Sequence, residues 1–253
     1  MVITEEIEFP AFTGNENRRL YVYLPVNYDG SDECYPVLYM FDGHNVFFDD
    51  DATYGKSWGL GEYLDETEAP LIVAALECHR GENLERLSEY SPYDLEHRQF
   101  GRAEGHGRET MEFFVNELKP MIDAEFRTIP DREHTFICGS SMGGLMAVYA
   151  ALEYNRYFSR AAGLSPSIFL CWKDMYNLAR ETKTGTGTVL YMDIGTKEVG
   201  KKGRASLAGF ARTLADNGIA VTYRIIPGGD HSEGSWERQL PFVIETLLYG
   251  VEI

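Results

Sequence analysis

Residues 136–152 combine two apolar runs with a glycine-rich turn, and this segment constrains the fold more than any other part of the chain. The first run, Phe136-Ile137-Cys138, is typical of a strand, and Leu145 to Leu152 is typical of a helix. The turn between them reads Gly139-Ser140-Ser141-Met142-Gly143 and fits the pattern G-x-S-x-G. In that pattern the central serine lies on a sharp turn with its hydroxyl exposed above a sheet. Ser141 is therefore the predicted nucleophile.

The two glycines that flank Ser141 have a steric role in this prediction. A turn this tight brings the backbone before and after the serine so close that a Cβ would crowd it. Ser140 has no such flanking glycines. Because the helix begins at the serine, the N–H of Met142 lacks a helical partner and can face negative charge that develops beside the hydroxyl. We expect it to be one donor of an oxyanion hole. A phosphate-binding loop is not indicated, because no Lys-Ser/Thr pair follows Gly144.

The length and composition predict one α/β domain over residues 1–253, since the chain has 253 residues and 44% hydrophobic content. The N-terminus carries Glu5 and Glu6 where a signal peptide needs basic residues, and no apolar run approaches the ~20 residues of a membrane span. These features predict a cytoplasmic protein. The four cysteines form no C-x-x-C pair, so we expect buried or semi-buried thiols, with no metal and no cofactor.

The formal net charge of -17 would repel the phosphate backbone of a nucleic acid. Nucleic-acid binders instead carry clustered lysine and arginine. The composition therefore favours a small-molecule partner and leaves the oligomeric state open.

Strand and helix patterns alternate along the chain, as in a mostly parallel sheet with helices on both faces. Residues 2–9 and 20–24, with Thr13-Gly14-Asn15 between them, predict an antiparallel hairpin at one sheet edge. The continuous apolar run 36–41 predicts a buried inner strand that ends at Asp42-Gly43-His44. Ligands bind at such strand ends, so the N–H of His44 is the candidate for the second oxyanion donor. The long polar segment 77–108 is interpreted as one wall of the substrate site.

A serine nucleophile needs a base, and the base needs an acid that holds its tautomer. In α/β-hydrolases the order along the chain is Ser, then Asp or Glu, then His. Only His231 follows Ser141, because the other histidines are His44, His79, His97, His106 and His134. Two carboxyl groups compete as the acid: Glu198 lies past the strand end at Gly195, and Asp193 lies inside the strand pattern. Glu198 is favoured, and Asp193 stays open as the alternative.

These motifs, in this order, resemble the putative-esterase branch of the α/β-hydrolases, which includes enterochelin, feruloyl and acetylxylan esterases, S-formylglutathione hydrolase and the mycolyltransferases. The resemblance covers most of the chain and rests on five motifs: residues 38–43, Glu89-Tyr90-Ser91-Pro92, residues 139–144, Gly195-Thr196-Lys197-Glu198, and Gly228-Gly229-Asp230-His231 with Trp236 beyond. It implies the α/β-hydrolase fold. It also implies that His44 gives an oxyanion N–H and that Glu198 is the acid.

The predicted function is hydrolysis of a carboxylic ester by a serine esterase, through an acyl-enzyme on Ser141 with His231 and Glu198. The substrates expected are small acyl, aryl or sugar esters. Acyl transfer to an alcohol by the same triad is the alternative, and a catalytically silent binding protein on this fold is a third hypothesis. Aromatic residues at strand ends and in loops could line the pocket, namely Phe47, Phe48, Trp58, Tyr90, Tyr93, Phe169 and Trp172.

Overall fold

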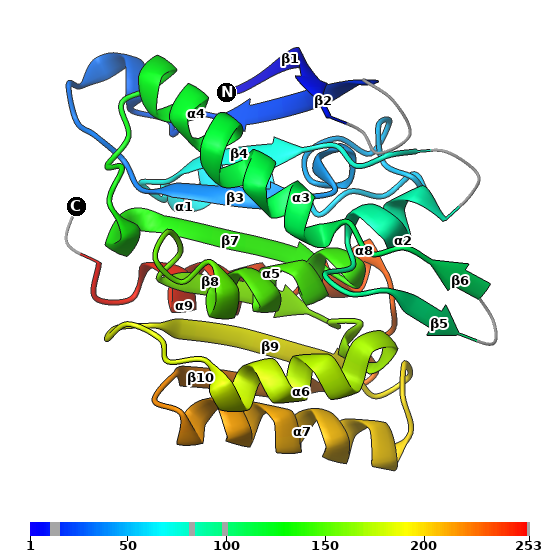
Figure 1. The fold of residues 1–253 in the computed structure, drawn as a ribbon. Helices are drawn as coiled ribbons and strands as arrows, with labels where there is room; N and C mark the ends of the chain where they lie inside the picture. The colour runs from blue at the N-terminus through cyan, green and yellow to red at the C-terminus, as the bar shows by residue number, and fades with distance from the viewer. Residues whose placement is uncertain (11–15, 81–83, 98–100, 252–253) are drawn as a thin grey trace.

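An eight-stranded sheet forms the centre of the molecule, in the order β1-β2-β4-β3-β7-β8-β9-β10 (Figure 1). The computed structural model describes residues 1–10, 16–80, 84–97 and 101–251. The strands are β1 (Val2–Phe9), β2 (Glu16–Tyr23), β3 (Val37–Phe41), β4 (Ile72–Leu76), β7 (Thr135–Ser140), β8 (Arg160–Leu164), β9 (Val189–Gly195) and β10 (Ala220–Ile226). Neighbouring strands from β4 to β10 run parallel, and β2 pairs antiparallel with both β1 and β4. The prediction of a mostly parallel sheet with an antiparallel N-terminal edge is confirmed. The predicted turn Thr13-Gly14-Asn15 lies outside the described residues.

Helices cover both faces of this sheet, and Figure 1 shows α3 to α7 on one face and α1 and α9 on the other. Alternation along each inner strand creates the two faces. In β3, Val37, Tyr39 and Phe41 pack under the first group, whereas Leu38 and Met40 pack under the second. The helices are α1 (Leu60–Thr67), α3 (Gly107–Phe113), α4 (Lys119–Glu125), α5 (Met142–Glu153), α6 (Trp172–Glu181), α7 (Lys201–Asp216), α8 (Glu233–Glu237) and α9 (Leu240–Leu248).

Two helical segments are irregular near prolines. Between α3 and α4 lies a π turn at Phe114–Leu118, directly before Lys119-Pro120. The last helical segment is divided into α8 and α9, with Pro241 in the first turn of α9. Proline has no N–H to donate and its ring clashes with the preceding turn, so a regular helix cannot continue through it.

The segment 77–108 has structure of its own, namely the helix α2 (Glu85–Glu89) and the small hairpin of β5 (Leu95–His97) and β6 (Gly101–Ala103). All four cysteines are free. Cys78, Cys138 and Cys171 are buried, but Cys34 is exposed, so the expectation of a buried or semi-buried thiol is wrong there. Within the described residues, no helix is long and apolar enough to cross a membrane.

Candidate active site

The carboxyl ends of the parallel strands meet at one edge of the sheet, and the segments after them carry the predicted site residues. Ser141 follows β7, Glu198 follows β9 and His231 follows β10. The loops that follow parallel strands all lie at the same edge of the sheet, and α/β proteins bind ligands at this edge. Residues that are 90 positions apart in the chain are thereby brought into contact, as between Ser141 and His231.

Ser141 has an unusual backbone conformation, with φ 57° and ψ -117°. A non-glycine residue in such a region costs of order 1–3 kcal/mol and persists only where its surroundings fix it. Here the Ser141 N–H donates to Leu164 O at 2.9 Å, and Ser141 O accepts from the N–H of Ser167 at 2.9 Å. A Cβ at Gly139 would lie 2.6 Å from the backbone of Gly143, so the tight turn requires glycine there. The strained turn presents the Ser141 hydroxyl at the edge of the sheet.

A continuous hydrogen-bonded chain links Ser141, His231 and Glu198. The distance from His231 Nε2 to Ser141 Oγ is 2.9 Å, and His231 Nδ1 lies 2.7 Å from Glu198 Oε2. The second oxygen, Glu198 Oε1, accepts from the N–H of Gly195 at 2.7 Å and from Ser165 Oγ at 2.7 Å. Burial raises the pKa of Glu198, but the hydrogen bonds from His231, Ser165 and Gly195 outweigh it, and the net pKa lies below its ordinary value. Glu198 is therefore held as a carboxylate that faces the imidazole.

Gly195 permits the approach of the two loops that carry this chain of hydrogen bonds. A Cβ at Gly195 would lie 2.3 Å from Gly229 O and 2.6 Å from Glu198 Oε1. Any residue other than glycine at position 195 would therefore push away the backbone of the loop that carries His231. The strand-end glycine thus sets how near Glu198 and His231 can lie.

Asp193, the alternative acid, occupies a different environment. Its side chain lies inside β9 and is 1% exposed. Oδ1 accepts from the N–H of Ser165 at 3.0 Å, and Oδ2 accepts from the Tyr191 hydroxyl at 2.9 Å. Burial raises the pKa of Asp193 to about 6. The hydrogen-bond partner of His231 is thus Glu198, and Asp193 supports the backbone of Ser165.

The two predicted oxyanion donors belong to different loops. Met142 is the first residue of α5, where an N–H has no partner within the helix. His44 lies in the 3₁₀ turn Gly43–Asn45 after β3, which follows Asp42 in a left-handed conformation with φ 59°. The Asp42 N–H donates to the Tyr90 hydroxyl at 3.1 Å. Its carboxylate accepts from Arg86 Nε and Arg86 Nη2, both at 2.7 Å. These contacts fix the turn that presents the backbone of His44.

The His44 side chain is buried, and its Nε2 lies 3.0 Å from Thr53 Oγ1. It lines the same cleft as Ser141.

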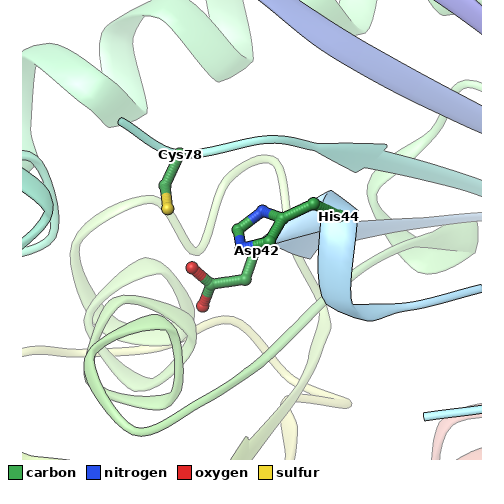
Figure 2. Close-up of side chains that lie close together, drawn as sticks. All are labelled: Asp42, His44 and Cys78. Carbon is green, nitrogen blue, oxygen red and sulfur yellow. The ribbon is translucent and has the colours of Figure 1, made fainter. Parts of the chain in front are cut away.

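Asp42, His44 and Cys78 converge on one space, as Figure 2 shows, and their potential ligand atoms lie within 4.8 Å of one another. The donor set nevertheless suits a cation poorly. Both oxygens of Asp42 already bind the Arg86 guanidinium, whose positive charge would oppose a metal ion. Burial, with the nearby Asp42, holds the pKa of the Cys78 thiol well above its ordinary value, so the thiolate that metals prefer is disfavoured. We interpret the cluster as the buried ion pair of Asp42 with Arg86, next to the side chains of His44 and Cys78.

Two compartments meet at Ser141, His231 and Arg86. The first, of about 740 Å³, is termed the apolar compartment and is lined mainly by Leu87, Met142, Pro166, Ile168, Phe169, Leu170, Trp172, Ile194, Val199 and Leu207. The second, of about 510 Å³, is termed the polar compartment and is lined by Asp42, His44, Asn45, Thr53, Tyr54, Cys78, His79, Arg80, Ser140, Glu233 and Trp236. Residues 78–80, 86 and 87 supply parts of these walls, in the segment 77–108 that the sequence predicts as one wall of the substrate site. Of the predicted aromatic lining, Phe169 and Trp172 lie in the apolar compartment.

Sequence reasoning missed Ser165 as a part of the site. Its hydroxyl donates to Glu198 and accepts from Trp236 Nε1 at 3.0 Å, and its φ is 45°. The available signal was its place directly after β8, at the edge where the other site residues gather. The Arg86–Asp42 ion pair was also missed, because 44 positions separate its partners and no local pattern relates them.

Comparison with known proteins identifies the family of the chain. The family model described as "Putative esterase" matches residues 12–245. The uncharacterized protein YbbA of Bacillus subtilis (strain 168) is 27% identical over 192 residues, which are 72% of this chain and 69% of that protein. A solved ferulic acid esterase superposes with a TM-score of 0.70 at 19% identity, over 97% of this chain and 98% of the other.

The siderophore hydrolase EstA from Aspergillus nidulans superposes with a TM-score of 0.72 at 18% identity, over 97% of this chain and 95% of its own. At these identities the solved structures establish the shared fold. The family model covers most of the chain. The chain belongs to the Putative esterase family of α/β-hydrolases and is a carboxylic ester hydrolase.

Proposed function

We propose that the chain hydrolyses its ester through an acyl-enzyme on Ser141, with His231 as the proton carrier and Glu198 as the acid that orients it. The observation that carries this proposal is the hydrogen-bonded chain of 2.9 Å from Ser141 Oγ to His231 Nε2 and 2.7 Å from Nδ1 to Glu198 Oε2. Both distances lie in the range over which protons are transferred. The strained backbone of Ser141 supports the same role, since such strain gathers at functional sites.

In the first step, Ser141 Oγ forms a bond to the carbonyl carbon while His231 Nε2 takes the hydroxyl proton. The charged imidazole then gives this proton to the leaving alkoxide, and the C–O bond of the ester breaks. In the second step, water attacks the acyl-enzyme, His231 takes its proton, and the acid leaves as Ser141 recovers its proton. Glu198 stabilises the positive charge that His231 carries in both steps. The backbone N–H groups of Met142 and His44 would bind the oxyanion.

The apolar compartment next to Ser141 suits an ester that carries an aromatic or alkyl group. Phe169 and Trp172 offer aromatic contacts there, and a volume of about 740 Å³ is ample for a substituted ring. The name of the ferulic acid esterase, which refers to an aromatic acid, agrees with an ester of this kind. We therefore propose esters of aromatic acids, with polar alcohols, as the first substrates to examine.

Covalent labelling with a fluorophosphonate probe tests the nucleophile directly. We expect one adduct, on the peptide that contains Ser141, and no adduct in Ser141→Ala. Ser140→Ala is the matched control and should still be labelled. Turnover of a small activated ester should fall by about 10⁴-fold or more in Ser141→Ala. Near-normal turnover in that variant would refute the proposal. Product analysis with an added alcohol separates hydrolysis, which gives the free acid, from acyl transfer, which gives a new ester.

A further inference from the structure

The polar compartment contains a buried carboxyl group that the proposed reaction does not use. Glu233 is 6% exposed and is the first residue of α8, two positions after His231. Its side chain lines the compartment together with Ser141 and His231. Within the described part of the chain, no side chain of another residue forms a hydrogen bond or ion pair with its carboxylate.

Glu233 is buried as a residue, but its carboxylate oxygens are not among the fully buried polar atoms that lack a hydrogen-bond partner. Most buried polar groups in proteins are hydrogen-bonded to neighbours, whereas among the described residues no other side chain donates to this carboxylate. Burial raises the pKa of Glu233; its own backbone N–H counteracts part of this, and the nearby Asp42 adds to the increase. A carboxyl group that lines a cleft and has no donor from another side chain is a candidate for binding a group that enters that cleft.

The other charged groups around this wall are already matched. Arg86 binds Asp42 through two hydrogen bonds, and Arg80 pairs with Glu77 at 3.2 Å. Neither guanidinium group forms an ion pair with Glu233 among the described contacts. Within the described residues, Glu233 is thus an acceptor without a donor from another side chain, and it lines the same compartment as Ser141.

We propose that Glu233 is a specificity-determining residue that accepts a hydrogen bond from a hydroxyl or ammonium group of the substrate in the polar compartment. This inference rests on the proposed esterase reaction at Ser141. An ionised carboxylate can only accept hydrogen bonds, so Glu233 favours a substrate that carries a donor. A substrate with an apolar group in its place would leave the carboxylate without that hydrogen bond. A site built to bind such a donor rejects the analogue that lacks it.

Matched esters with and without a donor test the proposal. On the alcohol side we use ethyl, 2-hydroxyethyl and 2-(dimethylamino)ethyl benzoate. On the acyl side we use phenyl acetate, phenyl glycolate and phenyl N,N-dimethylglycinate. The measured quantity is the ratio of kcat/KM for each donor ester to kcat/KM for its parent, in wild type, Glu233→Gln and Glu233→Leu. Glu237→Gln is the control, because Glu237 lies on the same helix, pairs with Lys56 at 2.9 Å and lies outside both compartments.

In Glu233→Leu we expect the ratio for a donor ester of at least one series to fall about 10- to 100-fold, the range for a hydrogen bond to a charged group. The hydroxyl and amino esters show which donor is preferred. Glu233→Gln keeps the size of the side chain and should lower the ratio less for the hydroxyl ester than for the amino ester. Glu237→Gln should leave every ratio as in wild type. Thermal melting shows that the variants are folded.

Ratios in both Glu233 variants that equal those of wild type would overturn the proposal, even if overall activity falls. Failure of the underlying function has a different signature. In that case wild type would hydrolyse none of the parent esters above the level of Ser141→Ala, and the inference about Glu233 would fall with it.

Discussion

Replacing Glu198 by glutamine should almost abolish catalysis while leaving the fold intact. The reason lies in the two oxygens of Glu198. Oε1 accepts from the Gly195 N–H, which can only donate, and from the Ser165 hydroxyl, whose oxygen already accepts from Trp236 Nε1. That position requires an acceptor, so the glutamine carbonyl must take it. The amide NH₂ then faces His231 Nδ1 at the 2.7 Å position now held by Oε2.

An NH₂ group in that place can only donate, so His231 Nδ1 must accept and Nε2 must carry the proton. His231 would then donate to Ser141 Oγ and could not take its proton. The wrong tautomer, with the lost charge, is expected to lower kcat by about 10⁴-fold, which equals about 5.4 kcal/mol of transition-state stabilisation. If the glutamine amide were rotated by 180°, its NH₂ group would face the Gly195 N–H, so that two donors would meet. Such a contact costs about 1–3 kcal/mol, which keeps the population of this rotated form, and the activity it can supply, to a few per cent.

The assay is kcat and KM for 4-nitrophenyl acetate, together with the melting temperature. Asp193→Asn is the matched acid-to-amide control, and it should keep much more activity because Asp193 does not contact His231. More than about a tenth of wild-type kcat in Glu198→Gln would refute the reasoning. If Asp193→Asn melted normally but were inactive while Glu198→Gln stayed active, the acid would be Asp193.

Three further predictions concern Gly139, Asp193 and Phe169. Gly139→Ala should lower the melting temperature by roughly 2–12 °C, because its Cβ would lie 2.6 Å from backbone; Gly209→Ala in α7, where a Cβ meets open space, should not lower it. The pKa of Asp193 is raised from its ordinary value of 3.8 to about 6, and this destabilises the fold as pH rises through that interval. Urea denaturation should therefore show Asp193→Asn gaining roughly 2 kcal/mol in free energy of unfolding relative to wild type between pH 4 and pH 8, and a constant difference would contradict it. Phe169→Ala should raise KM for an aryl ester about 2- to 12-fold more than KM for an acetyl ester, and equal changes would exclude a ring contact.

Most of the fold and the core of the site could be predicted because each depends on local pattern or on order along the chain. Buried strands such as 37–41 are continuous apolar runs, and the turn around Ser141 requires glycines that the sequence displays. His231 was identified because no other histidine follows Ser141. Glu198 was favoured for its place beyond a strand-end glycine, and the structure gives it the hydrogen bond to His231.

The parts that the sequence could not predict depend on contacts between distant segments. Arg86 reaches Asp42 from a helix that the polar composition of 77–108 did not reveal. Glu233 looks like an ordinary surface acid at the start of a helix until the cleft around it is known. The polar and apolar compartments likewise result from loops after β3, β4, β8 and β9 that meet only in the folded chain.

Glu198 and Asp193 illustrate how environment separates the roles of two carboxyl groups five positions apart. Three donors hold the pKa of Glu198 below its ordinary value, against its burial, whereas burial raises that of Asp193 to about 6. Both accept a hydrogen bond from Ser165: its N–H donates to Asp193, and its hydroxyl donates to Glu198. A change at Asp193 can therefore reach His231 through Ser165 and the Oε1 position of Glu198, or through the charge interaction between Asp193 and Glu198. Such a change would alter the orientation of the imidazole without removing the charge that faces it, and this is why the two amide variants should differ in kcat far more than in fold.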